Sequence, residues 1–136
     1  MNAVDTNIIA YSVDADGKEK RLKALALLQS LAPAETVIPW QVACELGSVL
    51  SKFVADGRTD TDPAAVIAAV TARFPLALPS EDLVLRGLRL RTAHQLSYWD
   101  ALLLAACLDA GVTRLYTEDL QSRPVIEGVE IVNPFA

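Results

Sequence analysis

Residues 3–11 read AVDTNIIAY: a short apolar start, an acid with two polar neighbours, and then a return to apolar residues. The pattern predicts a buried strand over residues 1–4, with Asp5 at its carboxyl end, followed by a helical turn over residues 7–12. Two interpretations of Asp5 stay open. Either Asp5 or Thr6 caps the helix, since both side chains offer an oxygen to free backbone N–H groups, or Asp5 belongs to an acidic cluster gathered from distant parts of the chain.

Helical and strand patterns alternate along the 136 residues, without a repeat, a low-complexity tract or a linker. This alternation predicts an α/β fold in a single domain, residues 1–136, with a mainly parallel sheet flanked by helices. Such sheets bind ligands beyond the carboxyl ends of their strands, where Asp5 is expected. Further strands are expected at 35–39, 75–79, 112–117 and 129–133. Helices are expected at 21–32, 40–54, 63–74, 80–95 (capped by Ser80) and 97–111, and loops at 15–20, 56–62 and 118–128.

The composition limits the class of protein. The chain has a net charge of −5 and a pI near 4.7, whereas a sequence-specific DNA-binding module usually presents a broad basic face. An acidic enzyme that binds divalent cations stays compatible with this charge, because bound ions invert it locally. The longest apolar run, ALLLAACL at 101–108, is too short to span a membrane. No basic segment precedes the first apolar stretch, so a signal peptide is not expected.

The cysteines and the single histidine favour no catalytic chemistry. Cys44 and Cys107 lie in apolar helical contexts without metal-type spacing, and are expected to be small buried residues of a reduced, cytoplasmic protein. His94 is expected to be a surface or capping residue rather than a catalytic base. The sequence has neither a Gly-rich phosphate loop nor a serine elbow motif.

Three further acids occupy positions that raise the same question as Asp5. Glu45 lies on the shoulder of an apolar helix stripe, Asp100 falls in the first turn of the most apolar helix, and Asp119 follows a strand. A carboxylate in such surroundings is costly unless it is paired, hydrogen-bonded or metal-bound.

Each of these acids also has a purely structural explanation. SYWD fits a capping box, in which Asp100 accepts from the backbone N–H of Ser97. Asp119 with Glu118 could open a turn, and Glu45 could be a solvated helix acid. These explanations treat each position separately and do not account for four acids near one rim. Four carboxylates there would repel each other without cations, and hard oxygen ligands of this kind suit Mg²⁺ or Mn²⁺.

Five stretches of the sequence together resemble the PIN-domain family, and more narrowly the VapC-type toxins of bacterial toxin–antitoxin pairs. The likeness runs essentially from end to end. It implies a three-layer α/β/α, Rossmann-like fold and a Mg²⁺- or Mn²⁺-dependent ribonuclease that hydrolyses RNA. It also implies a homodimer and a cognate VapB-type antitoxin that blocks the acidic pocket. The stretches are VDTNIIAY, WQVACEL, SYWDALLLAA, LYTEDL and GVEIVNPF.

The resemblance also implies roles for individual residues. Asp5, Glu45 and Asp100 match the acids that hold the main metal ion. Asp119 matches a less regular fourth acid, which assists directly, through water or through a second ion. Whether Asp119 or its neighbour Glu118 points inward stays open. The supporting positions that match are Thr6 and Asn7, after the first acid, and Thr117, before the last acidic pair.

The RNA-binding surface is less well defined by the sequence. Arg86 and Arg89 share a helix face in RGLRLR, which is either an RNA-binding rim or simply a solvated face. Trp40, Tyr98 and Trp99 could stack on bases, but their apolar neighbours favour core positions instead.

Two other functions remain to be distinguished from a ribonuclease. A Mg²⁺-dependent phosphatase could use Asp5 as its nucleophile, although such enzymes favour D-x-D where this chain has Asn7 at the second acidic position. A catalytically inactive, PIN-like domain could instead bind only a partner.

Overall fold

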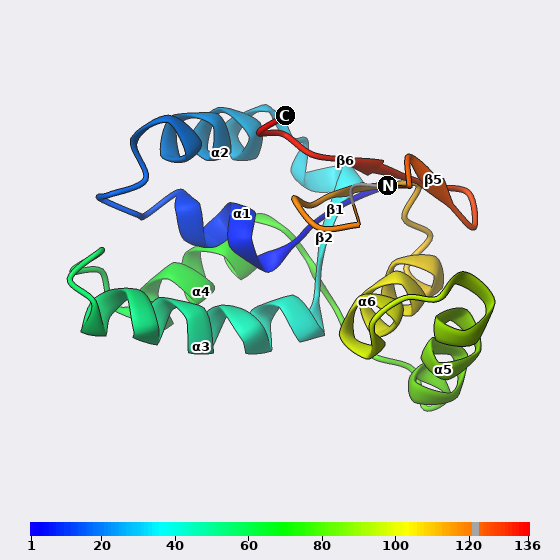
Figure 1. Cartoon of the computed structure of the whole chain (residues 1–136). Helices are drawn as coiled ribbons and strands as arrows, with labels where there is room; N and C mark the ends of the chain where they lie inside the picture. Colours follow the sequence, from blue (N-terminus) through cyan, green and yellow to red (C-terminus); the bar gives the residue numbers. More distant parts are fainter. Residues whose placement is uncertain (121–122) are drawn as a thin grey trace.

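The computed structural model describes residues 1–120 and 123–136 and places a six-stranded sheet at the centre of the molecule (Figure 1). The strand order is β3-β2-β1-β4-β6-β5. Neighbouring strands run parallel, except β5 and β6, which are antiparallel. The strands are β1 (Asn2–Val4), β2 (Thr36–Pro39), β3 (Leu76–Ala77), β4 (Arg114–Tyr116), β5 (Val125–Ile126) and β6 (Val129–Val132).

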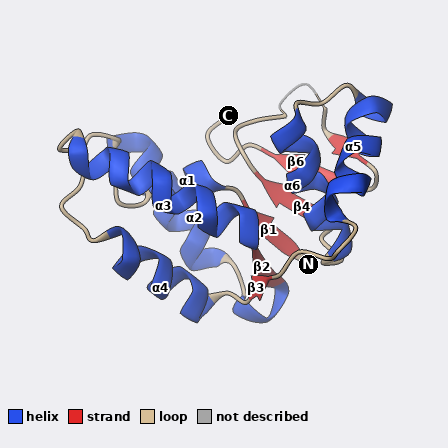
Figure 2. Cartoon of the chain, turned by 90° about the horizontal axis from the view of Figure 1, so that it is seen from below, coloured by secondary structure: helices blue, strands red, loops and turns tan. Residues whose placement is uncertain are grey.

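Helices cover the sheet on both sides. Figure 2 shows the sheet between a group formed by α1 to α4 and the pair α5 and α6. The expected α/β class with a mainly parallel sheet is therefore confirmed. The helices are α1 (Thr6–Tyr11), α2 (Lys18–Ser30), α3 (Trp40–Ala55), α4 (Pro63–Arg73), α5 (Leu83–His94) and α6 (Tyr98–Asp109), with a 3₁₀ turn η1 (Pro33–Glu35) before β2.

The central strands are short but almost wholly buried, as parallel strands covered on both faces usually are. Ala3 and Val4 of β1 and Leu115 of β4 have no exposed surface. Half of the residues of α6 are buried, and Leu103, Leu104 and Cys107 belong to this core. Each fully buried aliphatic side chain stabilises the fold by about 1.5–3 kcal/mol.

The register of the central strands sets the position of the site. Val4, the last residue of β1, pairs with Tyr116, the last residue of β4. One residue further on, the backbone N–H of Asp5 donates to the carbonyl of Tyr116 (2.9 Å), and that of Thr117 donates to the carbonyl of Val132 (2.9 Å). Asp5 and Thr117 therefore leave neighbouring strands side by side at one edge of the sheet.

Several expectations about element bounds are wrong. The second helix begins at Lys18, inside the expected loop. The helix α5 begins only at Leu83, because the Ser80 hydroxyl lies within hydrogen-bond distance of the carboxylates of Asp82 (2.9 Å) and Asp109 (2.7 Å) and does not cap it. The expected loop 118–128 contains β5, although residues 121 and 122 of that loop lie outside the described residues. The two residues of β5 follow Pro124 and precede Glu127 and Gly128, which are typical of a loop, and they were therefore read as part of one.

The cysteines differ from each other in burial. Cys107 is buried in α6, as expected, whereas Cys44 is exposed on α3, and both are free thiols. The expectation of a buried Cys44 is wrong because it lies about 200° around the helix from the core residue Val42. Across the described ranges, no helix is long and apolar enough to cross a bilayer.

Candidate active site

Asp5 is both a helix cap and a member of an acidic cluster. It is the N-cap of α1, and its Oδ1 accepts from the backbone N–H of Thr6 (2.7 Å). Its Oδ2 accepts from the hydroxyl of Thr117 (2.8 Å). The residue is only 8% exposed, so these hydrogen bonds hold a nearly buried carboxyl group in one orientation. The two interpretations drawn from the sequence are compatible.

Glu45 reaches the same place from α3. Its Oε2 accepts from the Thr6 hydroxyl (2.9 Å), and its Oε1 accepts from the side-chain amide of Gln41 (2.9 Å). The same amide donates to the backbone carbonyl of Trp99 on α6 (3.1 Å). Thr6 therefore links two acids, because its N–H binds Asp5 and its hydroxyl binds Glu45. The sequence reasoning did not single out Gln41, although its spacing of four residues from Glu45 on a helix was a usable signal.

Asp100 lies in the first turn of α6. The helix is capped by Ser97, whose hydroxyl accepts from the backbone N–H of Asp100 (3.2 Å). This is one half of the capping box expected from SYWD. The carboxylate itself lines a small hollow that Asp5 and Glu45 also line, which we call the acidic pocket. The N-terminus of α6 also favours a negative charge there.

Glu118 and Asp119 have different surroundings. Glu118 accepts from the hydroxyl of Tyr11 (2.6 Å), from Nζ of Lys20 (3.0 Å) and from the side-chain amide of Asn7 (3.3 Å). Asp119 instead lines the acidic pocket, and its backbone N–H donates to the Thr117 hydroxyl (3.0 Å). The acid that faces the other three carboxylates is therefore Asp119.

The acidic pocket is the hollow between these side chains. It has a volume of about 90 Å³ and lies at the carboxyl ends of β1 and β4, between the first turns of α1, α3 and α6. None of the described residues that line it carries a positive charge. The lining residues are Asp5, Thr6, Asn7, Gln41, Glu45, Val49, Trp99, Asp100, Leu103 and Asp119.

The electrostatics of the pocket disfavour full ionisation. Burial raises the pKa of Asp5 to about 6, and the nearby charges of Asp119 and Glu45 push it the same way, against the hydrogen bonds from Thr117 and Thr6. Burial also raises the pKa of Asp119, as do the charges of Asp100, Glu118 and Glu45. A shared cation would relieve both the desolvation and the repulsion.

The donor set of the acidic pocket fits a hard divalent cation. Within residues 1–120 and 123–136, no three His, Cys, Asp or Glu side chains form a ready-made metal cluster. Magnesium does not need one, because it usually keeps several waters and binds through one or two carboxylates together with substrate phosphates. Carboxylates, hydroxyls and amide oxygens are the groups that such ions select.

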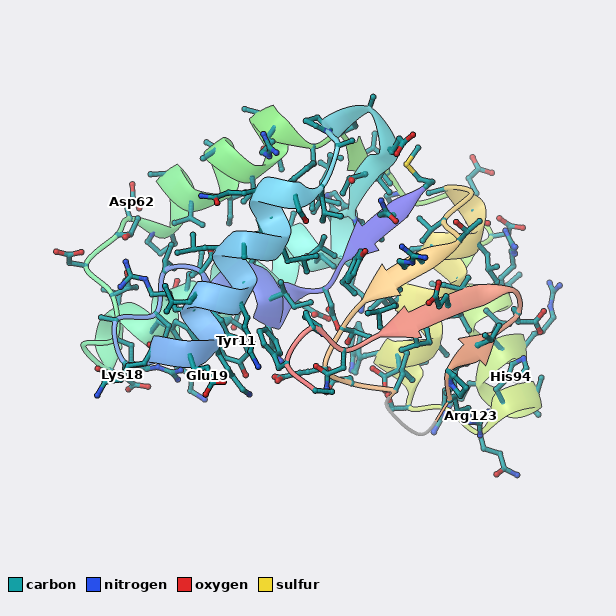
Figure 3. All side chains as sticks on the ribbon, turned by 90° about the horizontal axis from the view of Figure 1, so that it is seen from above. Tyr11, Lys18, Glu19, Asp62, His94 and Arg123 are labelled. Atoms are coloured by element: carbon teal, nitrogen blue, oxygen red, sulfur yellow. The ribbon has the colours of Figure 1, made fainter. Side chains whose placement is uncertain are left out.

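The residues proposed to guide RNA do not lie in the acidic pocket. Arg86 forms an ion pair with Asp109 of α6, and Arg89 lies beside it in a separate small hollow. His94 ends α5, and its Nε2 lies 2.7 Å from the carboxylate of Glu127. Figure 3 shows His94 at the opposite end of the molecule from Asp62.

A different basic side chain, that of Arg123, lies nearer to the acids. Arg123 lines an open depression of about 490 Å³ that includes Asp100 and Asp119, and it is labelled in Figure 3. Nothing in the sequence around Arg123 marked it as a candidate, because its position depends on how the chain returns after β4.

The expectation that the two tryptophans belong to the core is wrong. Trp40 is 48% exposed and Trp99 is 63% exposed, while Tyr98 is half-buried. Trp40 begins α3, and Trp99 lies in the first turn of α6. Each is followed by a residue that lines the acidic pocket, Gln41 and Asp100 respectively.

Comparisons with known proteins agree with this architecture. A toxin–antitoxin complex from Klebsiella pneumoniae has a TM-score of 0.69 at 22% identity, with 98% of each chain covered. VapC20 from Mycobacterium tuberculosis, described as a sarcin–ricin loop cleaving toxin, has a TM-score of 0.71 at 19% identity, with 96% of this chain and 99% of that chain covered. VapBC2 from Rickettsia felis, bound to a DNA fragment from its promoter, has a TM-score of 0.66 at 16% identity, with 97% of each covered.

Identities this low show a shared fold. The comparison with curated proteins found no match. Among family models, that of the PIN domain matches residues 3–123. This match spans most of the chain and includes all four carboxylates of the acidic pocket, and the chain therefore belongs to the PIN domain family.

Proposed function

We propose that this protein is a metal-dependent endoribonuclease and the toxin component of a VapBC-type toxin–antitoxin pair. The observation that carries the proposal is the acidic pocket, in which Asp5, Glu45, Asp100 and Asp119 meet without a lining cation. Membership of the PIN domain family and the likeness to structures described as toxins support it.

Mg²⁺ or Mn²⁺ bound in this pocket would supply an activated water and stabilise the leaving oxygen of the cleaved phosphodiester. The chain's own residues prepare the place where this happens. Thr117 and the N–H of Thr6 orient the carboxyl group of Asp5, while the Thr6 hydroxyl and Gln41 orient Glu45. Asp100 approaches from α6, and Asp119 completes the rim. Fixing these groups in advance lowers the cost of reorganising them during the reaction.

The hydrogen bonds of Asp5 do not favour the phosphatase alternative. Both of its carboxyl oxygens accept a hydrogen bond, and burial holds its pKa above the ordinary range. The two hydrogen bonds withdraw electron density from the oxygens, and the raised pKa lowers the fraction of Asp5 that is ionised.

The test is cleavage of structured RNAs by the purified protein in the presence of Mg²⁺, Mn²⁺ or EDTA. We expect cleavage with either metal, none with EDTA, and a large loss for Asp100→Asn. Cleavage that persists with EDTA and in the variant would contradict the proposal. A phosphoryl-enzyme trapped on Asp5 would favour the phosphatase instead.

The proposed partners rest on the same structural likeness. Structures similar to this chain are described as VapBC and toxin–antitoxin complexes, and we therefore propose a VapB-type antitoxin that covers the acidic pocket, acting on a cytoplasmic homodimer. Sedimentation of the purified chain, alone and with the product of an adjacent reading frame, would test both assemblies.

A further inference from the structure

A second hollow opens directly beside the acidic pocket. We call it the apolar groove. It has a volume of about 620 Å³ and lies between α3, the start of α5 and α6, next to β3. It shares three residues with the acidic pocket, Gln41, Glu45 and Trp99. Trp40 and Cys44 also line it, together with the apolar residues Leu83, Val84 and Leu102.

Two indole rings border this groove. Trp40 and Trp99 come from the first turns of two different helices, and both are about half exposed or more. Trp99 packs edge to face against Tyr98, with ring centroids 5.2 Å apart and an interplanar angle of 75°. This contact restricts the Trp99 side chain in advance. Large aromatic surfaces left in water next to a polar site are typical of a binding surface.

The charge of the groove indicates what it can bind. Glu45 is the single charged residue among the described residues that line it. A phosphate would therefore gain no ion pair there, and the chain as a whole, with its net charge of −5, repels a polyanion. An RNA substrate that reaches the acidic pocket needs an uncharged source of affinity beside it. Stacking of a base on an aromatic ring is such a source, because every base has a π-face.

Resting on the function proposed above, we infer that the apolar groove receives an unpaired nucleobase next to the scissile phosphodiester, stacked on the indole of Trp99. Gln41 fixes the backbone of Trp99 relative to Glu45, because its amide donates both to Glu45 (2.9 Å) and to the backbone carbonyl of Trp99 (3.1 Å). A base stacked on Trp99 is thereby kept in register with the acids. Arg123, in the depression on the side of Asp100 and Asp119, meets the backbone of the strand as it leaves. The substrate class is single-stranded or loop RNA, since bases within a duplex are not free to enter a groove.

The two indoles provide a direct readout, because Trp40 and Trp99 are the only tryptophans of the chain. The experiment uses the Asp100→Asn variant, which is expected to bind without cleaving, and titrates it with a single-stranded RNA hexamer while tryptophan fluorescence is recorded. The same hexamer with abasic sites and a duplex of the same sequence serve as comparison ligands. We expect the hexamer to quench the fluorescence and the other two to bind at least tenfold more weakly.

Substitutions at Trp99 separate stacking from simple apolar contact. The side chain is 63% exposed, so its replacement leaves the core intact. We expect Trp99→Leu, in the Asp100→Asn background, to raise the Kd for the hexamer about tenfold to a hundredfold, and Trp99→Phe to restore most of the affinity. Trp40 supplies the remaining fluorescence in both variants. Leu22→Ala on α2, equally exposed but outside the groove, is the matched control and is expected to bind normally.

The salt dependence of binding is a second readout. If stacking supplies the affinity, the Kd should change little between low and physiological salt, whereas phosphate contacts would give a steep dependence. Equal binding of the intact and abasic hexamers, or a Trp99→Leu variant that binds like Trp99→Phe, would overturn the inference. The proposed function would then still stand if the parent protein cleaves RNA and Asp100→Asn does not.

A second copy of the chain is the competing occupant, and Cys44 distinguishes it. Cys44 is exposed and lines the groove, while Cys107 is buried, so a maleimide reagent should react with Cys44 alone. We expect the hexamer to slow this reaction and the abasic hexamer to leave it unchanged. Protection that depends on protein concentration, with no effect of RNA, would assign the groove to self-association and overturn the inference.

Discussion

Glu118 and Asp119 are neighbours in the chain and line one open depression, yet of the two only Asp119 lines the acidic pocket. Glu118 joins β4 to the first two helices through Tyr11 and Lys20, while Asp119 completes the rim of the acidic pocket. Lys20 in turn lies over the rings of Tyr11 and Phe135, 4.7 Å and 5.4 Å from their centroids. Glu118 therefore holds the elements around the site together, and Asp119 is the one of the two that joins the other acids of the pocket.

The first prediction uses this pair as matched variants. We expect Glu118→Gln to lower the free energy of unfolding by about 1 kcal/mol, because it weakens an ion pair that is partly open to solvent, and to leave most of the RNA cleavage. Asp119→Asn should keep the stability, or raise it slightly, and reduce cleavage. Chemical denaturation and cleavage rates for both variants check this. The opposite pattern, with cleavage lost mainly in Glu118→Gln, would show that the roles are exchanged.

The second prediction concerns the pH dependence of the metal-free protein. Burial raises the pKa of Asp5 to about 6, from 3.8 in the unfolded chain. Between these values the folded state binds more protons than the unfolded state, so the Asp5 contribution to stability falls as pH rises from 4 to 7, by about 2–3 kcal/mol. We therefore expect Asp5→Asn to be more stable than the parent at pH 7 in EDTA, and inactive.

The measured quantity is the difference in the free energy of unfolding between Asp5→Asn and the parent at each pH. Titration of the other groups cancels in this difference, because it is the same in both proteins. The gain of Asp5→Asn should shrink toward zero below pH 4. Added Mn²⁺ should stabilise the parent at pH 7 and not the variant. A constant difference across the range would mean that Asp5 is ionised normally in the folded protein.

The third prediction tests the packing of α5 on α6. A Cβ added at Gly87 would lie 2.7 Å from Cδ2 and 3.4 Å from the backbone Cα of Leu102. We expect Gly87→Ala to destabilise the protein by about 1–3 kcal/mol, despite the better helix propensity of alanine. Gly47→Ala on α3 is the matched control, since its Cβ would meet only Ile67, at an ordinary 3.8 Å. That variant should be neutral or about 1 kcal/mol more stable.

The fourth prediction concerns a buried ion pair away from the site. Asp14 is 1% exposed and accepts two hydrogen bonds from Arg58, which also lies 3.8 Å from the ring centroid of Phe53. The hydrogen bonds from Arg58 hold the pKa of Asp14 below its ordinary value. We expect Arg58→Met to destabilise the protein by about 2–3 kcal/mol at pH 7, because it leaves a buried carboxylate unpaired.

The stabilisation by the Asp14–Arg58 pair depends on pH in the opposite direction to the contribution of Asp5. The stabilisation from the Asp14 pair is present at neutral pH and is lost as pH falls and Asp14 is protonated, so the penalty of Arg58→Met should shrink in acid. Arg114→Met breaks an ion pair with Glu130 in which both side chains are about half exposed. It serves as the control and should cost much less than Arg58→Met, because solvent screens an exposed ion pair. Equal penalties for the two arginines would show that burial of Asp14 is unimportant.

The fold class was predictable from the sequence because its signal is distributed over many residues. The alternation of strand and helix patterns survives errors in single bounds, such as the start of α2 at Lys18. The strand β5 was missed because its two residues stand between Pro124 and the turn residues Glu127 and Gly128, whereas the equally short β3 lies in a longer apolar stretch. The start of α5 was misplaced because the Ser80 hydroxyl binds Asp109, a tertiary contact that no local pattern shows.

The convergence of the acids was predictable because Asp5 and Asp119 follow parallel strands, and parallel strands end at one edge of a sheet. The choice between Glu118 and Asp119 was not, since it depends on Tyr11 and Lys20 from distant helices. The exposure of Trp40 and Trp99 was missed for a related reason. Apolar neighbours in the sequence indicate a buried helix, but they do not show which of its first residues extend past the neighbouring elements.

The hydrogen bonds that join β1, β4 and β6 have one further consequence. Asp5 and Thr117 are anchored through their own backbones to the next strands, so Asp5 keeps its position for as long as the central sheet stays closed. Urea should abolish catalysis and structure in a single transition, with one midpoint. An inhibitor of this protein would therefore act by filling the pocket or by withdrawing its proposed metal ion, and not by loosening the sheet that holds Asp5.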